Sequence, residues 1–113
     1  MPFIDTKATV SISKEKELQL KERFGKAIEL IRGKTERWLM LSFSGEESMY
    51  FAGSDEPCAI LEVKIFGKAS EGEYQRLTAA LCSAVTEILG IDGTRVYVKY
   101  EEVDTWGYNG MNF

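Results

Sequence analysis

The sequence predicts an α+β fold of two pseudo-repeated β-α-β halves, forming a four-stranded mixed sheet with two helices on one face. A strand-helix-strand pattern occurs twice, and its helix-like stretches start 57 residues apart, at Lys14 and Glu71. A crossover helix between neighbouring strands implies that the two strands of each half are parallel. The 113 residues suffice for one compact domain, so residues 1–113 are assigned to a single domain.

The first half begins with a strand over residues 3–10, which are rich in β-branched residues. Ser13 is suited to cap a helix over residues 14–31, and Gly33 is suited to end it. Residues 37–43 then predict a second strand. The apolar stripe of the helix consists of Leu20, Phe24, Ala27, Ile28 and Ile31.

The second half repeats this order. Residues 58–66 predict a mostly buried strand, and residues 94–100 predict the last one. Ser70 and Glu73 have the spacing of a capping box, which starts a helix that ends near Gly90. The apolar stripe of this helix consists of Tyr74, Leu77, Leu81, Val85 and Ile88.

Two segments lie outside this repeat. The bridge between the halves, residues 44–57, is rich in turn formers and could contain a short edge strand over residues 49–51. The tail places Trp106, Tyr108 and Phe113 among glycines and asparagines.

Two helices on one face leave the other face of the sheet uncovered. Residues 37–43 and 58–66 are too apolar to meet water there, and the chain has no further element to cover them. A second copy of the chain is the simplest cover, so we expect a homo-oligomer.

Composition excludes several classes of function. A net charge of −4 argues against nucleic acid as a partner, because phosphate binding requires a concentrated basic face. No apolar run approaches the roughly 20 residues of a membrane span, and no signal peptide is recognisable, so we expect a cytoplasmic protein whose export would need another route. Cys58 and Cys82 are then expected to be reduced thiols. The chain contains no histidine, which removes Ser-His-Asp and Cys-His machinery and most transition-metal sites.

Five features together resemble the macrophage migration inhibitory factor branch of the tautomerase superfamily, over essentially the whole chain. They are Pro2 after Met1, "GK" at residues 33–34, "GSDEPCAILEVKIFGK" at residues 53–68, "RVYVKY" at residues 95–100, and the glycine-aromatic tail. The helices and the "KIFGKAS" stretch are more similar to microbial phenylpyruvate tautomerase-like members than to the animal cytokines.

The resemblance implies a homotrimer whose sheets form a barrel, with three sites between subunits. It also implies keto–enol tautomerisation of 2-oxo acids such as phenylpyruvate, without a metal or other cofactor. By similarity, Pro2 is the catalytic base, and Lys34 and the backbone N–H of Phe66 hold the substrate carboxylate. Tyr97 corresponds to a tyrosine supplied by the neighbouring subunit.

Further substrate contacts are expected from Lys99, Trp106 and Tyr108. Lys99 stands where animal members usually have asparagine, so its contact with the far end of the substrate departs from the family pattern. Of the family's two paired cysteines, this chain retains only Cys58, and Leu61 stands where the motif has its second cysteine. Thiol–disulfide activity is therefore not expected.

Pro2 suits the chemistry if Met1 is removed, because the ring nitrogen is then a free secondary amine. An enolising base must be neutral near pH 7 yet basic enough to take a proton from carbon. An α-amino group starts with a pKa of about 7.7–8.0, and apolar surroundings lower it further. Lys34 would pair with the carboxylate and hold the reacting carbon against Pro2.

Other interpretations remain open from the sequence alone. Lys34 could be a solvated charge near a helix end, Tyr97 an ordinary strand residue, and Trp106 and Tyr108 packing residues between subunits. The protein could be a non-enzymatic binding protein or cytokine mimic that keeps the trimer and pocket. It could also use the proline for dehalogenation or decarboxylation, which would call for extra arginines or acids near the pocket; Glu101 and Glu102 are candidates.

Overall fold

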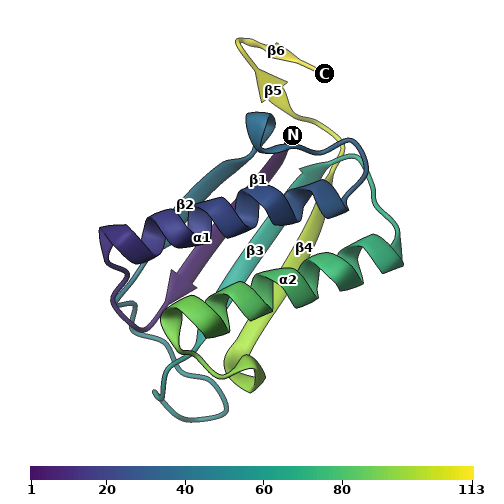
Figure 1. Ribbon diagram of the computed structural model, residues 1–113. Coiled ribbons are helices and arrows are strands. Elements are labelled where there is room, and N and C mark those ends of the chain that lie inside the picture. The colour runs from purple at the N-terminus through teal and green to yellow at the C-terminus, as the bar shows by residue number, and fades with distance from the viewer.

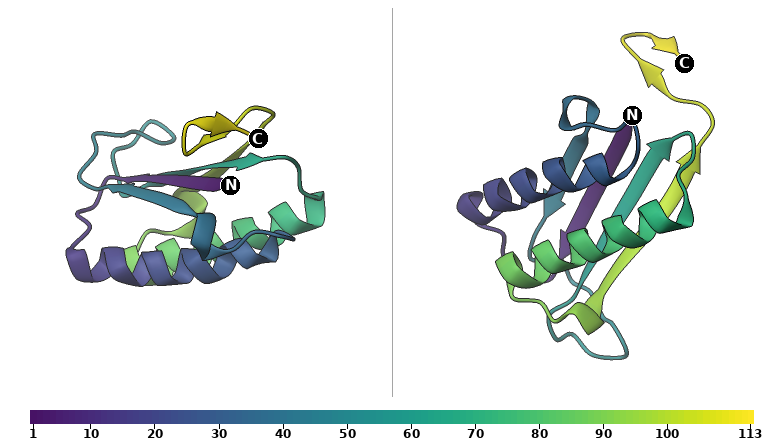
Figure 2. Two further views of the ribbon diagram at one scale, coloured as in Figure 1. Left: turned by 90° about the horizontal axis from the view of Figure 1, so that it is seen from above. Right: turned by 45° about the vertical axis from the view of Figure 1, so that its right-hand side comes forward.

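The computed structural model describes residues 1–113 and places four strands in one sheet, in the order β2-β1-β3-β4. Both long helices, α1 and α2, lie across the same face of this sheet (Figure 1; Figure 2, left). The elements are β1 (Pro2–Ala8), α1 (Lys14–Ala27), β2 (Met40–Ser44), β3 (Ala59–Phe66), α2 (Glu71–Leu89), β4 (Val96–Val103), and a terminal hairpin of β5 (Gly107–Tyr108) and β6 (Met111–Asn112). This arrangement confirms the predicted α+β fold.

The strand pairing follows the two-halves pattern. β1 pairs with β2 in parallel, and β3 pairs with β4 in parallel. The halves join through an antiparallel pairing of β1 with β3, in which Pro2 lies opposite Ile65 and Ala8 opposite Ala59. The start of β1 and the end of β3 therefore meet at one end of the sheet.

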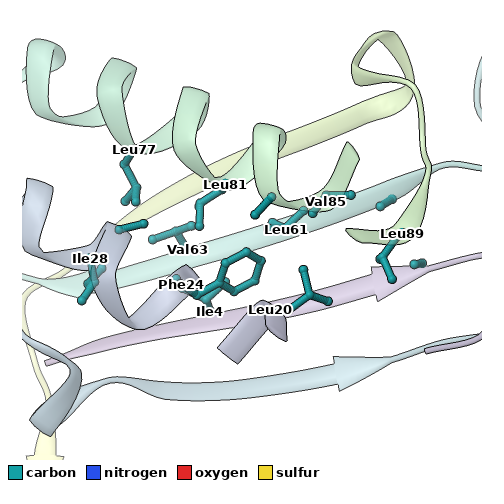
Figure 3. Packing of buried hydrophobic residues seen from close by; sticks show 14 of the residues in the cluster. Ile4, Leu20, Phe24, Ile28, Leu61, Val63, Leu77, Leu81, Val85 and Leu89 are labelled. Carbon is teal, nitrogen blue, oxygen red and sulfur yellow. The ribbon is translucent and has the colours of Figure 1, made fainter. Parts of the chain in front are cut away.

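The core fills the space between the sheet and the two helices (Figure 3). Alternate residues of each strand point to the helices, so Ile4 of β1 and Leu61 and Val63 of β3 are fully buried. The helices contribute one apolar face each, as their spacing predicts. Their fully buried members are Leu20 and Phe24 of α1 and Leu77, Leu81 and Val85 of α2.

Both predicted helix starts are confirmed. The Ser13 hydroxyl accepts the N–H of Lys16 at 3.2 Å. At α2, the Ser70 hydroxyl accepts the N–H of Glu73 at 3.1 Å, and the Glu73 carboxylate accepts the N–H of Ser70 at 2.8 Å. Gly90 ends α2 with a φ of 72°, a left-handed conformation that glycine adopts without a steric penalty.

The segment after α1 differs from the prediction. α1 ends at Ala27 and is followed by a 3₁₀ turn over Ile28–Leu30, instead of continuing to Ile31. The predicted strand over residues 37–43 is shorter, because Glu36–Trp38 form a second 3₁₀ turn, η2, and β2 begins only at Met40. This turn contacts α1: a Cβ on Gly25 would lie 2.6 Å from the Glu36 carboxyl carbon, so the Glu36 side chain lies directly over Gly25. Glu36 also pairs with Lys21 of α1 at 3.1 Å.

Three smaller boundaries also differ. The first strand covers Pro2–Ala8 rather than residues 3–10, and the last covers Val96–Val103 rather than residues 94–100, because Gly93–Arg95 form a 3₁₀ turn. β3 begins at Ala59, one residue after the predicted start. The proposed edge strand over residues 49–51 is absent, and only an isolated bridge joins Phe51 to Ser54.

One side chain, Arg95, holds the loop before β3. Its Nε donates to the carbonyl of Pro57 at 2.9 Å, and Nη1 donates to that of Phe51 at 3.2 Å. Its Nη2 donates to the carbonyls of Ser54 at 3.2 Å and Glu56 at 2.9 Å. Residues 51–57 have no regular secondary structure, and these four hydrogen bonds from one guanidinium group hold the loop in position.

We expect Arg95→Met to lower the free energy of unfolding by about 1–3 kcal/mol, because the loop carbonyls lose their charged donor. Urea denaturation measures this loss, and faster chymotrypsin cleavage after Tyr50 or Phe51 would report the loosened loop. Arg76→Met is the matched control, since Arg76 is an exposed arginine on α2. Equal stability and cleavage for both variants would contradict the clamp.

The uncovered sheet face is mixed rather than apolar, which corrects one premise of the sequence analysis. Leu61, Val63 and Ile65 point to the helices, while Glu62 and Lys64 alternate with them on the open face. The apolar character of β3 is therefore satisfied within the chain and does not require a second copy. Neither α1 nor α2 combines the length and apolarity needed to cross a bilayer.

Candidate active site at the start of β1

Pro2 is buried at the first position of β1. Proline is tolerated at this position because its missing N–H interrupts the ladder only at the strand's start. The N-terminus lies at the end of the sheet from which the β5-β6 hairpin extends, beside the segment that leads into β2 (Figure 1; Figure 2, right). Residues distant in the sequence can therefore surround Pro2.

Lys34 and Phe66 meet Met1 beside Pro2. The Nζ of Lys34 donates to the carbonyl of Phe66 at 3.0 Å, and the N–H of Phe66 donates to the carbonyl of Met1 at 3.0 Å. The structure thus brings together three residues that the sequence analysis assigned to one site: Pro2, Lys34 and Phe66.

The loop that carries Lys34 is fixed from two sides. The N–H of Lys34 donates to the carbonyl of Ile31 at 3.0 Å, across a turn in which Gly33 has a φ of 81°. The N–H of Arg32 donates to the Glu73 carboxylate at 2.7 Å. This bond, with the one from Ser70, lowers the pKa of Glu73 to about 2. Glu73 therefore serves both the start of α2 and the placement of Lys34.

The electrostatics of the site disfavour a charged amine. The pKa of the Met1 amino group is lowered from 8.0 to about 6, first by burial and then by the nearby charge and hydrogen bond of Lys34. Burial and the Lys34 charge both act on Met1, the residue directly before Pro2. The Met1 amine is therefore mostly neutral at pH 7.

We expect Lys34→Met to raise the pKa of the Met1 amino group from about 6 toward 8.0, because it removes the neighbouring cation. NMR titration of a synthetic chain that retains a labelled Met1 would measure the shift. Between these pH values the unfolded chain binds more protons than the folded one, so stability rises with pH across this window, and less steeply in the variant. Lys26→Met, on the solvent face of α1, is the control; an unchanged midpoint in Lys34→Met would refute the coupling.

A hollow of about 550 Å³ opens at Pro2. Its walls are mainly apolar and aromatic, and they include both tail aromatics named in the sequence analysis, Trp106 and Tyr108. The full lining is Met1, Pro2, Phe3, Arg37, Trp38, Leu39, Met40, Trp106, Gly107 and Tyr108.

The aromatic residues of this region form a connected wall. The Trp38 ring packs edge-on against Tyr108 at 5.2 Å between centroids, and Tyr108 stacks with Phe113 at 6.3 Å. The Phe113 and Phe66 ring centroids are 5.8 Å apart, so the aromatic wall extends to the side of the site where Lys34 lies. Such a wall suits a planar or apolar substrate body.

A slightly larger hollow, about 600 Å³, lies between α1 and β2 and has a different character. Its charged lining residues pair with one another, Lys14 with Glu17 and Lys21 with Glu36. It contains neither Pro2 nor Lys34. Size alone therefore does not identify the site, and the chemistry favours the hollow at Pro2.

Sequence reasoning missed Arg37 and Trp38 as residues of this site. A strand over residues 37–43 would send neighbouring side chains to opposite faces, whereas η2 directs both into the lining of one hollow. The available signal was Gly25 inside a helix, which marks a close approach by another segment.

Tyr97 and Lys99 lie elsewhere in the same chain. Tyr97 pairs with Ile60, which lies opposite Lys7 on β1, five residues beyond Pro2, or about 17 Å along the strand. Its ring packs against Phe51 at 4.8 Å and is 59% exposed. One chain therefore cannot bring Tyr97 to its own Pro2.

Lys99 is already paired on the open face of the sheet. Its Nζ lies 3.0 Å from Glu101 and 3.8 Å from Glu62. The bond with Glu101, and then the charge of Glu101 and Glu62, raise the pKa of Lys99. Its charge is locally compensated.

Comparison with known proteins decides the family. The family model described as "Macrophage migration inhibitory factor (MIF)" matches residues 1–113. The chain belongs to the macrophage migration inhibitory factor family.

Solved structures of family members share the whole fold. MIF2 from Leishmania major has a TM-score of 0.94 and 32% sequence identity, covering 100% of this chain and 97% of that one. The MIF homologue from Prochlorococcus marinus has a TM-score of 0.89 and 32% identity, covering 98% of each chain. Among curated relatives, macrophage migration inhibitory factor from Xenopus laevis is 29% identical over 83 residues, or 72% of each chain. The predicted resemblance to the MIF-like branch of the tautomerase superfamily is confirmed.

Proposed function

We propose that this protein is a cofactor-independent keto–enol tautomerase of 2-oxo acids such as phenylpyruvate, with Pro2 as its general base. The supporting observation is the buried Pro2, which shares a largely apolar hollow with aromatic residues and lies beside Lys34 and Phe66. The proposal requires Met1 to be removed, since only then is the Pro2 nitrogen an amine.

Removing Met1 frees two groups at once. The Pro2 nitrogen ceases to be an amide, and the Phe66 N–H loses its bond to the Met1 carbonyl. That N–H and the nearby Lys34 ammonium can then hold a substrate carboxylate. Both donors lie on the Phe66 side of the hollow, so the rest of the substrate would extend along the aromatic wall.

The reaction moves one proton. The neutral Pro2 nitrogen takes a proton from the carbon beside the carbonyl. The electrons of that C–H bond form the C=C bond of the enol, while the π electrons of the C=O bond move onto the oxygen. The protonated nitrogen then gives a proton to the oxygen, which restores the neutral amine. Burial and the Lys34 charge, which lower the pKa of the Met1 amine, would act on a Pro2 amine in the same direction.

The separation of Tyr97 from Pro2 supports a site built between subunits. In the proposed homotrimer, Tyr97 and Lys99 of one chain would approach Pro2 of its neighbour, giving three sites. Cys58 and Cys82 are both unpaired, which agrees with the proposed cytoplasmic location.

Three measurements on the native protein test the proposal. We expect the intact mass to be lower by one methionine residue, and the protein to accelerate the decay of enol-phenylpyruvate absorbance. Sedimentation of the same sample should give the mass of three chains. A processed trimer without activity would favour the alternative, a binding protein that keeps the trimer and pocket; activity in a sample that retains Met1 would overturn Pro2 as the base.

A further inference from the structure

Arg37 is an uncompensated cation in the wall of the Pro2 hollow. It is exposed, and its guanidinium carbon lies 5.2 Å from the centre of the Trp38 ring. No carboxylate pairs with it, although the chain carries 18 acidic residues against 14 basic ones. None of the residues that line the hollow is acidic.

Several cations elsewhere have carboxylate partners, although Lys7, Lys16 and Lys64 have none. Lys21 pairs with Glu36, Arg23 with Glu87 at 2.7 Å, and Lys99 with Glu101 and Glu62. Glu36 lies next to Arg37 in the chain, yet it turns to α1. Arg37 therefore keeps its full capacity for an anion inside the hollow.

Arg37 also adds to a positive charge that is already present. Lys34 lies at the Phe66 side of Pro2, while Arg37 and Trp38 belong to the lining of the hollow itself. A substrate with one carboxylate uses the first cation and leaves the second unpaired. Two separate cations without carboxylate partners match an anion with two negative groups.

We infer that the site prefers 2-oxo acids bearing a second carboxylate, which Arg37 binds while Lys34 and the Phe66 N–H hold the first. This inference rests on the proposed tautomerase function and defines its substrate class. The planar fork of arginine can donate two parallel hydrogen bonds to a carboxylate, which lysine cannot reproduce. Its contact with Trp38 keeps the side chain over the wall.

The test compares kcat/KM for the enol of oxaloacetate, a four-carbon 2-oxo dicarboxylate, with that for enol-phenylpyruvate. In Arg37→Met, we expect the ratio of the two values to fall by about tenfold or more, the usual loss of a hydrogen bond to a charged group. Arg37→Lys should lose less of the ratio, because it keeps the charge. Arg76→Met makes the same change in net charge on α2 and should leave the ratio as in the wild type.

The outcomes separate this inference from the function on which it rests. If Arg37→Met lowers both rates equally, Arg37 only supports the Trp38 wall and the inference is wrong. If Arg76→Met changes the ratio as much as Arg37→Met, the effect is long-range and again contradicts a contact. If the wild type acts on neither substrate, the proposed function itself fails. Activity on enol-phenylpyruvate with a ratio that Arg37→Met does not change overturns the dicarboxylate preference alone.

Discussion

Blocking the Pro2 nitrogen should lower kcat/KM for enol-phenylpyruvate by about 10²–10⁴-fold, the usual contribution of a positioned general base. Inserting one lysine between Met1 and Pro2 achieves this, because Pro2 then remains an amide whether or not Met1 is removed. An amide nitrogen has no available lone pair and cannot take the proton. The insertion leaves the side chains of Lys34 and Phe66 unchanged.

Pro2→Gly separates the two properties of this residue. It retains a free amine at the same place and loses the rigid ring, so we expect a smaller loss of kcat/KM than for the insertion. Thermal unfolding of both variants, monitored by circular dichroism, controls for damage to β1. Equal rates for the wild type, the insertion and Pro2→Gly would exclude Pro2 from the reaction.

Phe24→Ala should lower the free energy of unfolding by about 3–5 kcal/mol, because it opens a cavity at the centre of the core. Phe24 is fully buried in the core (Figure 3). Its ring stacks with that of Phe43 of β2 at 5.9 Å between centroids. Urea denaturation would measure the change. Few other single substitutions in this chain remove as much buried volume.

The matched control lies on the same helix. Leu18 of α1 is 52% exposed, so Leu18→Ala removes an apolar side chain without opening an enclosed cavity. We expect its effect on the free energy of unfolding to stay below about 1 kcal/mol. A loss for Phe24→Ala no larger than that for Leu18→Ala would show that α1 does not depend on this packing.

The sequence was sufficient for the fold because its local signals agree with one another. Both helices have serine caps followed by apolar residues at helical spacing, and both crossovers specify parallel strand pairs. The prediction was wrong where a tertiary contact decides the local structure. Residues 36–38 form a 3₁₀ turn in which Glu36 lies over Gly25 of α1, a contact that no periodicity of that segment reveals.

The site could be predicted only in part for a similar reason. Pro2, Lys34 and Phe66 meet because strand register brings their segments to one end of the sheet, and their motifs were recognisable. Arg37 lines the hollow because residues 36–38 form a 3₁₀ turn that the sequence did not predict. The predicted apolar open face was wrong because strand alternation assigns Leu61, Val63 and Ile65 to the helices and Glu62 and Lys64 to the other side.

The bond from Phe66 to the Met1 carbonyl has a practical meaning for anyone who purifies this protein. On the proposed mechanism, Met1 of the newly translated chain blocks the site, and the protein becomes active only when a methionine aminopeptidase removes this residue. If overexpression is faster than the removal of Met1, the purified protein would be a mixture of active chains without Met1 and inactive chains that retain it. Specific activity should then track the trimmed fraction from batch to batch, while the melting curve and the hydrodynamic size stay nearly the same.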